Sequence, residues 1–349
     1  STSMIRLNFI GTLDGNGHTI SNVHFGLFYN NYGIVKNLKL NAVDDGSSYY
    51  RGYTYHKTIN EYYPEYYNQK AGIVASYNYG IIDAIEIDGN FQENVSQNTK
   101  NQETSVLTSG ISYKNSGLIY KCQMNARLMG TNLAGIAYEN AGKIYGCSVE
   151  GTLNGTYPGR KSGDSKLNLY GSIAGITAVN SGWIEQCYSG AAILSYASKY
   201  VGANDNGWYK LTPTAAALVV RNNSSGTIKN CSTGGYINLL NSSSCMVGDA
   251  PGNDGNWSYG QNQINCSFSR YVYTNNGTIN GAFIGAAYRI TKPLDDRLLV
   301  TYNEKDSDSS GTNNNVFSLE KESITLYDAG NNVVNNSRAE EYGSSGRLY

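Results

Sequence analysis

The 349-residue chain is poor in charge, proline and histidine. Charged residues make up 15% of it, well below the roughly 25% of ordinary soluble domains. Its 26 Lys and Arg nearly balance its 27 Asp and Glu, so no basic excess exists to bind a nucleic-acid backbone electrostatically. No apolar run approaches the roughly 18 residues that a membrane-spanning helix needs. The composition therefore argues against nucleic acid as a partner and against a transmembrane segment.

Glycine, asparagine and tyrosine are abundant instead, with 40, 43 and 31 residues. Asn, Gly and Tyr are poor helix formers, which argues against a helical bundle. Hydrophobic residues at 40% and aromatic residues at 12% argue against a disordered chain. The composition predicts an all-β, turn-rich protein with a polar surface that carries many tyrosines.

A short phrase recurs along most of the chain: an apolar strand, then Asn-x-Gly, then a second apolar strand. Such internal repetition indicates a repeat architecture. Asn and Gly tolerate the positive φ that a tight corner needs, so we expect that corner at these pairs. The pairs are Asn31/Gly33, Asn78/Gly80, Asn115/Gly117, Asn140/Gly142, Asn180/Gly182, Asn223/Gly226 and Asn275/Gly277.

The spacing between successive turn glycines varies as 47, 37, 25, 40, 44 and 51 residues. All of this variation falls after the second strand, so each repeat has a fixed half and an extensible half. Two strands and a return within 25 residues are typical of one coil of a parallel β-helix. Because parallel crossovers are almost always right-handed, we predict a right-handed parallel β-helix with its long loops on one side.

Four of the six cysteines share one position, five residues after the turn glycine. Other copies have Leu38, Ile85 or Ala282 there, which predicts an inward-facing core position. Disulfides between neighbouring coils and a metal site are the alternatives. These cysteines are Cys122, Cys147, Cys187 and Cys231, while Cys245 and Cys266 lie outside the pattern.

The start of the chain resembles GLUG-motif repeats. The phrase GTLDGNGHTI, residues 11–20, precedes GLF at Gly26 and VKNL at Val35. The resemblance covers about residues 5–290 and implies a parallel β-helix similar in outline to pectate lyases. Such repeats occur in large bacterial surface and secreted proteins, including some IgA-cleaving metallopeptidases. The resemblance implies an extracellular or bacterial cell-surface location and carries no agreed catalytic residues.

Three segments follow from the repeat boundaries. Residues 1–25 are expected to form an N-terminal coil or cap, and residues 26–290 the GLUG-like β-helix repeats. Residues 291–349 are expected to form a C-terminal cap or the edge of a neighbouring domain, because the ends of repeat arrays need covering. Both ends look cut, which suggests a fragment of a larger protein.

The insertions within the extensible halves are rich in tyrosine and tryptophan. Exposed aromatic rings beside amide and charged groups suit sugars, whose C–H faces stack on a ring while their hydroxyls form hydrogen bonds. The alternative is that these loops only pack on one another and cover one flank. The candidate glycan-binding residues are Tyr62, Tyr66, Tyr157, Arg160, Lys161, Tyr200, Trp208, Tyr209, Trp257 and Tyr259.

Catalytic motifs are weak. There is no HExxH zinc-peptidase motif, and the catalytic residues stay unknown. Glu86 and Asp88 alternate with isoleucines on one strand. They form an acidic pair of the kind that glycosidases use, a calcium corner, or only a solvated strand face, and Asp44/Asp45 or Asp249/Asp254 are similar candidates in loops. Asp306-x-Asp308 opens like a calcium loop, but Phe317 stands where the final Glu belongs. We therefore expect no cofactor or metal, with Ca2+ as an alternative that lacks a complete motif.

We expect an extracellular surface module, an adhesin or stalk that contacts polysaccharide or glycoprotein glycans through its aromatic loops, and we favour a chain without catalysis. Two alternatives stay open: a polysaccharide lyase or glycoside hydrolase of the β-helix type, and a structural spacer that self-associates.

Overall fold

The computed structural model describes residues 8–23, 26–42, 71–92, 107–130, 132–157, 166–197, 208–239, 263–291, 299–304, 308–318, 326–327 and 333–334. Within these ranges the chain is all β-structure and contains no helix. The strands form four sheets, in which neighbouring strands run parallel except for one short antiparallel pair near the C-terminus.

The strand bounds are as follows. The nine-stranded sheet contains β1 (Asn8–Phe9), β4 (Phe28–Asn31), β7 (Ala75–Asn78), β11 (Ser112–Asn115), β16 (Ala137–Asn140), β21 (Thr177–Asn180), β26 (Val219–Asn222), β30 (Val272–Asn275) and β34 (Asp308–Ser309). The thirteen-stranded sheet contains β2 (Thr12–Asp14), β3 (Thr19–Val23), β5 (Ile34–Ala42), β8 (Ile81–Asp88), β12 (Leu118–Tyr120), β13 (Gln123–Met124), β17 (Lys143–Tyr145), β18 (Ser148–Val149), β22 (Trp183–Glu185), β23 (Tyr188–Ser189), β27 (Thr227–Thr233), β31 (Thr278–Ile284) and β35 (Thr312–Ser318). The eight-stranded sheet contains β9 (Asn90–Gln92), β14 (Arg127–Gly130), β19 (Thr152–Tyr157), β24 (Ala192–Ala197), β28 (Tyr236–Leu239), β32 (Ala287–Thr291), β36 (Leu326–Tyr327) and β37 (Val333–Val334). The seven-stranded sheet contains β6 (Ala71–Gly72), β10 (Leu107–Ser109), β15 (Leu133–Ala134), β20 (Lys166–Ala174), β25 (Trp208–Ala216), β29 (Gln263–Ser269) and β33 (Leu299–Glu304).

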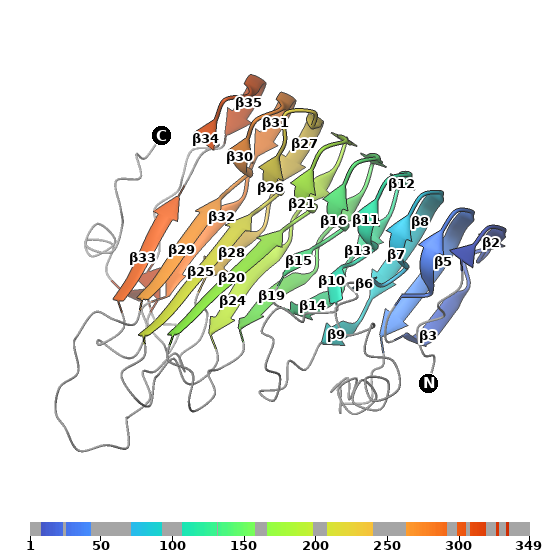
Figure 1. Cartoon of the computed structure of the whole chain (residues 1–349), viewed down its shortest axis with the longest axis horizontal. Helices are drawn as coiled ribbons and strands as arrows, with labels where there is room; N and C mark the ends of the chain where they lie inside the picture. The colour runs from blue at the N-terminus through green and yellow to red at the C-terminus, as the bar shows by residue number, and fades with distance from the viewer. Residues whose placement is uncertain are drawn as a thin grey trace, which may run out of the picture.

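The chain passes through the four sheets in a fixed order. Strands β10, β11, β12 with β13, and β14 lie in the seven-, nine-, thirteen- and eight-stranded sheets, and β15 to β19 repeat that order. Each strand pairs with its equivalent in the next pass, which we call a layer. Figure 1 shows the layers side by side from the blue N-terminal end to the orange-red C-terminal end. The prediction of an all-β chain with parallel strands is confirmed.

Equivalent residues of successive layers stack in the interior. Ile82, Ile119, Ile144, Ile184 and Ile228 pair in register and are fully buried. Alternate side chains of a strand point to opposite faces, so the residues on either side of each isoleucine face outward. A single apolar cluster that extends through the layers forms most of the core.

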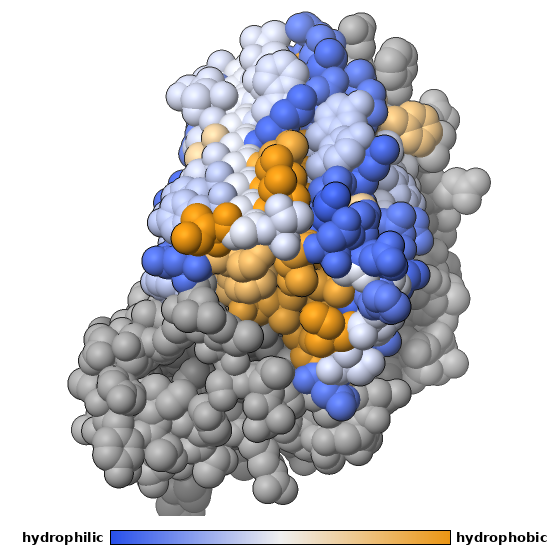
Figure 2. All heavy atoms as spheres, turned by 90° about the vertical axis from the view of Figure 1, so that its right-hand side faces the viewer, coloured by the Kyte–Doolittle hydropathy of each residue, from blue (hydrophilic) through white to orange (hydrophobic). Residues whose placement is uncertain are grey.

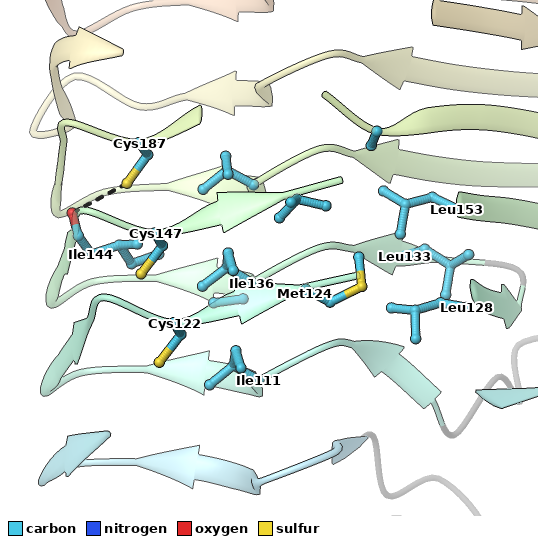
Figure 3. Packing of buried hydrophobic residues seen from close by; sticks show 14 of the residues in the cluster. Ile111, Cys122, Met124, Leu128, Leu133, Ile136, Ile144, Cys147, Leu153 and Cys187 are labelled. Atoms are coloured by element: carbon cyan, nitrogen blue, oxygen red, sulfur yellow. Dashed lines mark hydrogen bonds between the residues drawn. The ribbon is translucent and has the colours of Figure 1, made fainter. Parts of the chain in front are cut away.

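The predicted core position of the cysteines is confirmed. Cys122, Cys147, Cys187 and Cys231 are buried and free of disulfides, and Figure 3 shows the first three in line along one corner of the core. Cys231 pairs in register with Ala282. This corner accepts Cys, Ala, Leu or Ile because it only has to be filled with apolar atoms.

The turn asparagines have a role that differs from the predicted one. Their side chains are buried, and each Nδ2 donates to the Oδ1 of the next at 2.7–2.8 Å. None of them has positive φ, so the expected backbone role is wrong. In the sixth copy the ladder position is Asn222, not the predicted Asn223. The ladder consists of Asn31, Asn78, Asn115, Asn140, Asn180, Asn222, Asn275 and Asn313.

Seven of the positive φ angles lie four residues after the turn glycines, where the thirteen-stranded sheet bends. This corner residue is left-handed in every layer from the second to the eighth, with φ between 49° and 76°. It immediately precedes the core position that the cysteines occupy. The corner residues are Asn37, Ala84, Lys121, Gly146, Gln186, Asn230 and Gly281.

The turn glycines are required by close packing of the layers. A Cβ on Gly142 would lie 2.2 Å from the carbonyl oxygen of Gly117, and one on Gly117 would lie 2.1 Å from that of Gly80. Such approaches exclude any side chain, so backbone stacks directly on backbone at this turn.

The strands that flank the insertions are described, although most of each insertion is not. The connections from β9 to β10, β19 to β20, β24 to β25 and β28 to β29 all leave the eight-stranded sheet and enter the seven-stranded sheet. Strand pairing also continues past residue 290, because β34 and β35 pair with β30 and β31. Asp308, which we had considered as part of a calcium loop, therefore lies in a strand.

Candidate functional site

Three of the predicted glycan-binding residues lie in described strands. Tyr157 ends β19 and pairs with Ala197. Trp208 and Tyr209 begin β25, where they pair with Lys166 and Leu167. The structure therefore places these aromatic residues at the strand ends that flank two insertions. The other predicted residues lie outside the described residues: Tyr62, Tyr66, Arg160, Lys161, Tyr200, Trp257 and Tyr259.

The described residues bring a different set of aromatic side chains together, on the outer face of the thirteen-stranded sheet. Tyr120, Tyr145 and Trp183 each lie beside one of the buried isoleucines, so strand alternation turns them outward. Tyr120 and Tyr145 pair in register, and their rings stack with centroids 5.5 Å apart. Trp183 is 38% exposed. These rings follow one another across the sheet on a backbone fixed by its parallel neighbours.

Charged side chains occupy the gaps between the rings. Lys121 Nζ lies 4.9 Å from the ring centroid of Tyr120. Lys143 Nζ lies 5.0 Å from the ring centroid of Tyr145 and 5.9 Å from that of Trp183. Cations over aromatic faces are favourable, though weakly so at exposed sites.

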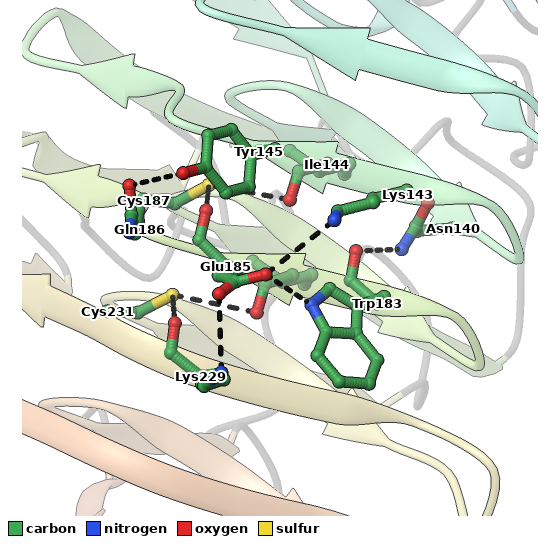
Figure 4. A network of polar contacts seen from close by, with 11 residues as sticks. Asn140, Lys143, Ile144, Tyr145, Trp183, Glu185, Gln186, Cys187, Lys229 and Cys231 are labelled. Atoms are coloured by element: carbon green, nitrogen blue, oxygen red, sulfur yellow. Dashed lines mark hydrogen bonds and ion pairs between the residues drawn. The ribbon is translucent and has the colours of Figure 1, made fainter.

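Glu185 is the centre of this network, which Figure 4 shows from close by. Its Oε2 accepts a hydrogen bond from Trp183 Nε1 at 2.9 Å. Lys143 Nζ lies 3.6 Å from Oε2, and Lys229 Nζ lies 3.5 Å from Oε1. The indole hydrogen bond, followed by the two lysines, lowers the pKa of Glu185 below its usual value. Glu185 therefore stays ionised and fixes the indole orientation.

Short polar side chains follow Trp183 in the later layers. Trp183 pairs in register with Thr227, which pairs with Thr278. Two positions further along the same strands, Glu185 pairs with Lys229, which pairs with Asn280. The indole thus stands at the edge of a strip of hydroxyl, ammonium and amide groups. We call Trp183, Thr227, Lys229, Thr278 and Asn280 the Trp183 shelf.

The acidic pair that we considered for catalysis lies on a solvated strand face. Glu86 Oε2 lies 2.6 Å from Lys39 Nζ, and this contact raises the pKa of Lys39. Asp88 lies two residues further along β8, beside Asn41. A carboxylate that is already paired with a lysine on an open sheet lacks the facing partner that glycoside hydrolysis requires. The other acidic pairs, Asp44/Asp45 and Asp249/Asp254, lie outside the described residues.

Among the described residues, no three His, Cys, Asp or Glu side chains gather in a way that could hold a metal ion. The described part of the chain also has no helix that is long and apolar enough to cross a membrane.

Sequence reasoning missed the outer face of the thirteen-stranded sheet because it searched the insertions. The signal was present: each aromatic residue flanks a buried isoleucine in Leu-Ile-Tyr, Lys-Ile-Tyr and Trp-Ile-Glu. An alternating strand with an aromatic outer residue in three successive copies predicts outward rings on this sheet face. Tyr120 and Tyr145 share one row, and Trp183 lies in the neighbouring row of Lys143.

Comparisons with protein-family models, with curated proteins and with solved structures found no match for this chain.

Proposed function

We propose that this protein is a non-catalytic glycan-binding module, an adhesin or stalk that presents aromatic side chains on a rigid repeat scaffold. The supporting observation is Trp183, an exposed indole held by Glu185 beside the hydroxyl and amide groups of the shelf. A pyranose has an apolar C–H face and a rim of hydroxyls. The indole can stack on the C–H face while Thr227, Thr278 and Asn280 form hydrogen bonds with the hydroxyl rim.

The scaffold in this proposal is a right-handed parallel β-helix. The fixed order of the sheets and the pairing of each layer with the next support it, and right-handed crossovers are the strong rule for parallel strands. The long loops on one side are part of this proposal. Four of the insertions connect the eight-stranded to the seven-stranded sheet, and the first connects β5 of the thirteen-stranded sheet to β6 of the seven-stranded sheet. Tyr157, Trp208 and Tyr209 would then extend glycan contact to that flank.

Family and location belong to the same proposal. The phrase from Gly11 to Ile20 and the copy after Gly26 resemble GLUG-motif repeats, and such repeats occur in surface and secreted bacterial proteins. An extracellular or cell-surface module fits a scaffold whose variable side chains point outward along its whole length.

The test is binding of the chain to a panel of microbial, plant and mucin polysaccharides, with Trp183→Ala beside the intact protein. Trp183→Ala should abolish binding to any polysaccharide that the intact chain binds. Tyr79→Ala is the matched control, because Tyr79 is 47% exposed and stacks on Tyr32, away from the shelf. Equal binding by the Trp183 variant and the intact chain would refute the proposed site. Release of soluble sugar from any polymer would favour the lyase or hydrolase alternative instead.

A second function, self-association, has one observation in its favour. Figure 2 looks at the N-terminal end and shows an apolar patch there, surrounded by hydrophilic residues. Ile10 is 79% and Ile20 is 37% exposed at this end. The two ends of the nine-stranded sheet are β1 and β34, both parallel to their neighbours, so a second copy could continue the sheet head to tail. Ile10→Asp should lower any concentration-dependent rise in mass measured by light scattering.

A further inference from the structure

The charged cluster of Lys143, Glu185 and Lys229 beside the Trp183 shelf carries two positive charges and one negative charge. Glu185 faces two ammonium groups, those of Lys143 and Lys229, at 3.6 and 3.5 Å. One carboxylate cannot satisfy both, because each ammonium has three donors. The lysine side chains are 47% and 40% exposed, whereas that of Glu185 is 14% exposed. The anion is enclosed, and the cations remain accessible.

The two lysines differ in position relative to the indole. Lys143 precedes Trp183 in its row and lies against the rings of Tyr145 and Trp183. Lys229 lies one layer after Glu185, in the row beside Thr227 and next to Asn280. A sugar stacked on the side of Trp183 that faces Thr227 would therefore meet Lys229 and not Lys143.

We propose that the Trp183 shelf recognises a carboxylate-bearing sugar, a uronic or sialic acid, with the ring on Trp183 and the carboxylate on Lys229. This inference rests on the proposed glycan-binding function and names its substrate class. The ligand carboxylate supplies the second anion that the Lys143–Glu185–Lys229 cluster lacks. The threonine hydroxyls and the Asn280 amide bind the hydroxyl rim of the same sugar.

Charge-assisted hydrogen bonds are stronger than neutral ones. The carboxylate therefore raises the affinity and also makes the site select acidic sugars over neutral ones. Glu185 lies between the two ammonium groups, so the ligand carboxylate approaches Lys229 from the side that is turned away from Glu185. A neutral sugar keeps the stacking and the hydroxyl contacts but loses the contact with Lys229. We therefore expect neutral polymers to bind more weakly, and their binding not to depend on Lys229.

The experiment compares acidic polymers with partners that lack the carboxylate, either because the carboxyl group is reduced or because the whole sialic acid is removed. Hyaluronan and alginate are tested against their carboxyl-reduced forms, and mucin against desialylated mucin, by isothermal titration and affinity electrophoresis. At least one acidic polymer should bind about tenfold more tightly than its neutral partner. Lys229→Met, which keeps the apolar stem, should remove this difference and leave binding to the neutral partner within about twofold.

Lys114→Met is the control for loss of a paired surface lysine. Lys114 lies on the nine-stranded sheet, 3.0 Å from Glu139 and 44% exposed, and its loss should leave every affinity unchanged. Equal binding of acidic and neutral partners, together with loss of both in Trp183→Ala, would overturn the inference and leave the glycan-binding function standing. Binding that Trp183→Ala does not change would overturn both.

Discussion

At the scale of single residues, the left-handed corner of the thirteen-stranded sheet requires a backbone conformation that most residue types adopt only at a cost. Asn and Gly occupy it in several layers, but Ala84, Lys121 and Gln186 occupy it with φ of 49°, 49° and 52°. A left-handed conformation costs a residue with a Cβ roughly 1–2 kcal/mol. The repeat tolerates this cost because the neighbouring core residue and both strands fix the bend.

Gly146→Ala isolates this conformational cost. Gly146 has φ of 62°, and a Cβ there would meet only Lys121 Cγ, at an ordinary 3.7 Å. The variant should therefore lose about 1–2 kcal/mol of unfolding free energy without a steric clash, measured by urea denaturation. Ala84→Asn should act in the opposite direction, since Asn tolerates this conformation. An unchanged midpoint for Gly146→Ala would show that the corner φ is not strained.

Asp14 makes the first layer sensitive to acid. Its carboxylate accepts hydrogen bonds from Asn37 Nδ2 and the Asn16 backbone, both at 3.0 Å, and pairs with Lys36 at 3.1 Å. These contacts, the Asn37 bond first, lower its pKa from 3.8 to about 2. Because the folded-state pKa is the lower one, the stabilisation is complete above pH 3.8 and is lost as the pH falls through about 2.

Carboxyl-carbon NMR of Asp14 tests this directly. The resonance should titrate near pH 2 in the intact chain and at a higher pH in Asn37→Ala, which lacks the amide donor but keeps the Asn16 and Lys36 contacts. An identical midpoint in the two proteins would exclude Asn37 as the main cause.

At the scale of elements, the asparagine ladder ties each strand of the nine-stranded sheet to the next. Asn140 accepts from Asn115 and donates to Asn180, both at 2.8 Å, and is 2% exposed. Every ladder side chain between the two ends, Asn31 and Asn313, both accepts and donates within the ladder. An ionised carboxylate can only accept, whereas a protonated one can do both.

Asn140→Asp should therefore be destabilised in a pH-dependent way. Burial and the facing Oδ1 of Asn180 raise its folded-state pKa above the unfolded value of about 3.9. The variant should be close to the intact protein in stability below that pH, and should lose stability as the pH rises toward the folded-state pKa. Urea denaturation at pH 4 and pH 7 measures this. Asn276→Asp is the control, because exposed Asn276 only accepts, from Ser310 Oγ at 3.0 Å, and its stability should not change with pH in this way.

The same two elements show what the sequence could and could not predict. Apolar alternation around Ile119, Ile144 and Ile184 was enough to predict parallel strands and a filled core, since burial leaves a periodic trace. The role of the turn asparagine was predicted wrongly, because Asn serves equally as a left-handed residue and as a paired amide. The true corner includes Lys121 and Gln186, whose identities carry no such signal.

The candidate site divides in the same way. Rings in the insertions were predicted from composition, and Tyr157, Trp208 and Tyr209 do lie at strand ends beside them. The Trp183 shelf depends on which residues of different layers come into register. Layer spacing varies from 25 to 51 residues, so no fixed sequence period brings Trp183 next to Thr227. The shelf could therefore be identified only once the strand register between layers was known.

At the scale of the whole molecule, each layer contacts mainly its neighbours, so stability accumulates along a line. Interior layers are held on two sides, and the layers near the ends have fewer neighbours to restrain them. Local opening should therefore begin near the ends and reach the middle last. The cysteine corner places natural probes along this line, with Cys122 and Cys147 in central layers and Cys231 nearer the C-terminal end.

Alkylation rates of these thiols report the order of opening. All four are at most 2% exposed, and burial raises the pKa of Cys147 and Cys231, so reaction requires opening of the core. In native buffer, peptide mass spectrometry should find all four protected, with Cys231 labelled faster than Cys147. The urea-unfolded chain, in which every thiol reacts, sets the reference rate. Equal slow rates at the two positions would instead mean that the layers open as one cooperative unit, and that the nearest-neighbour description of this repeat fails.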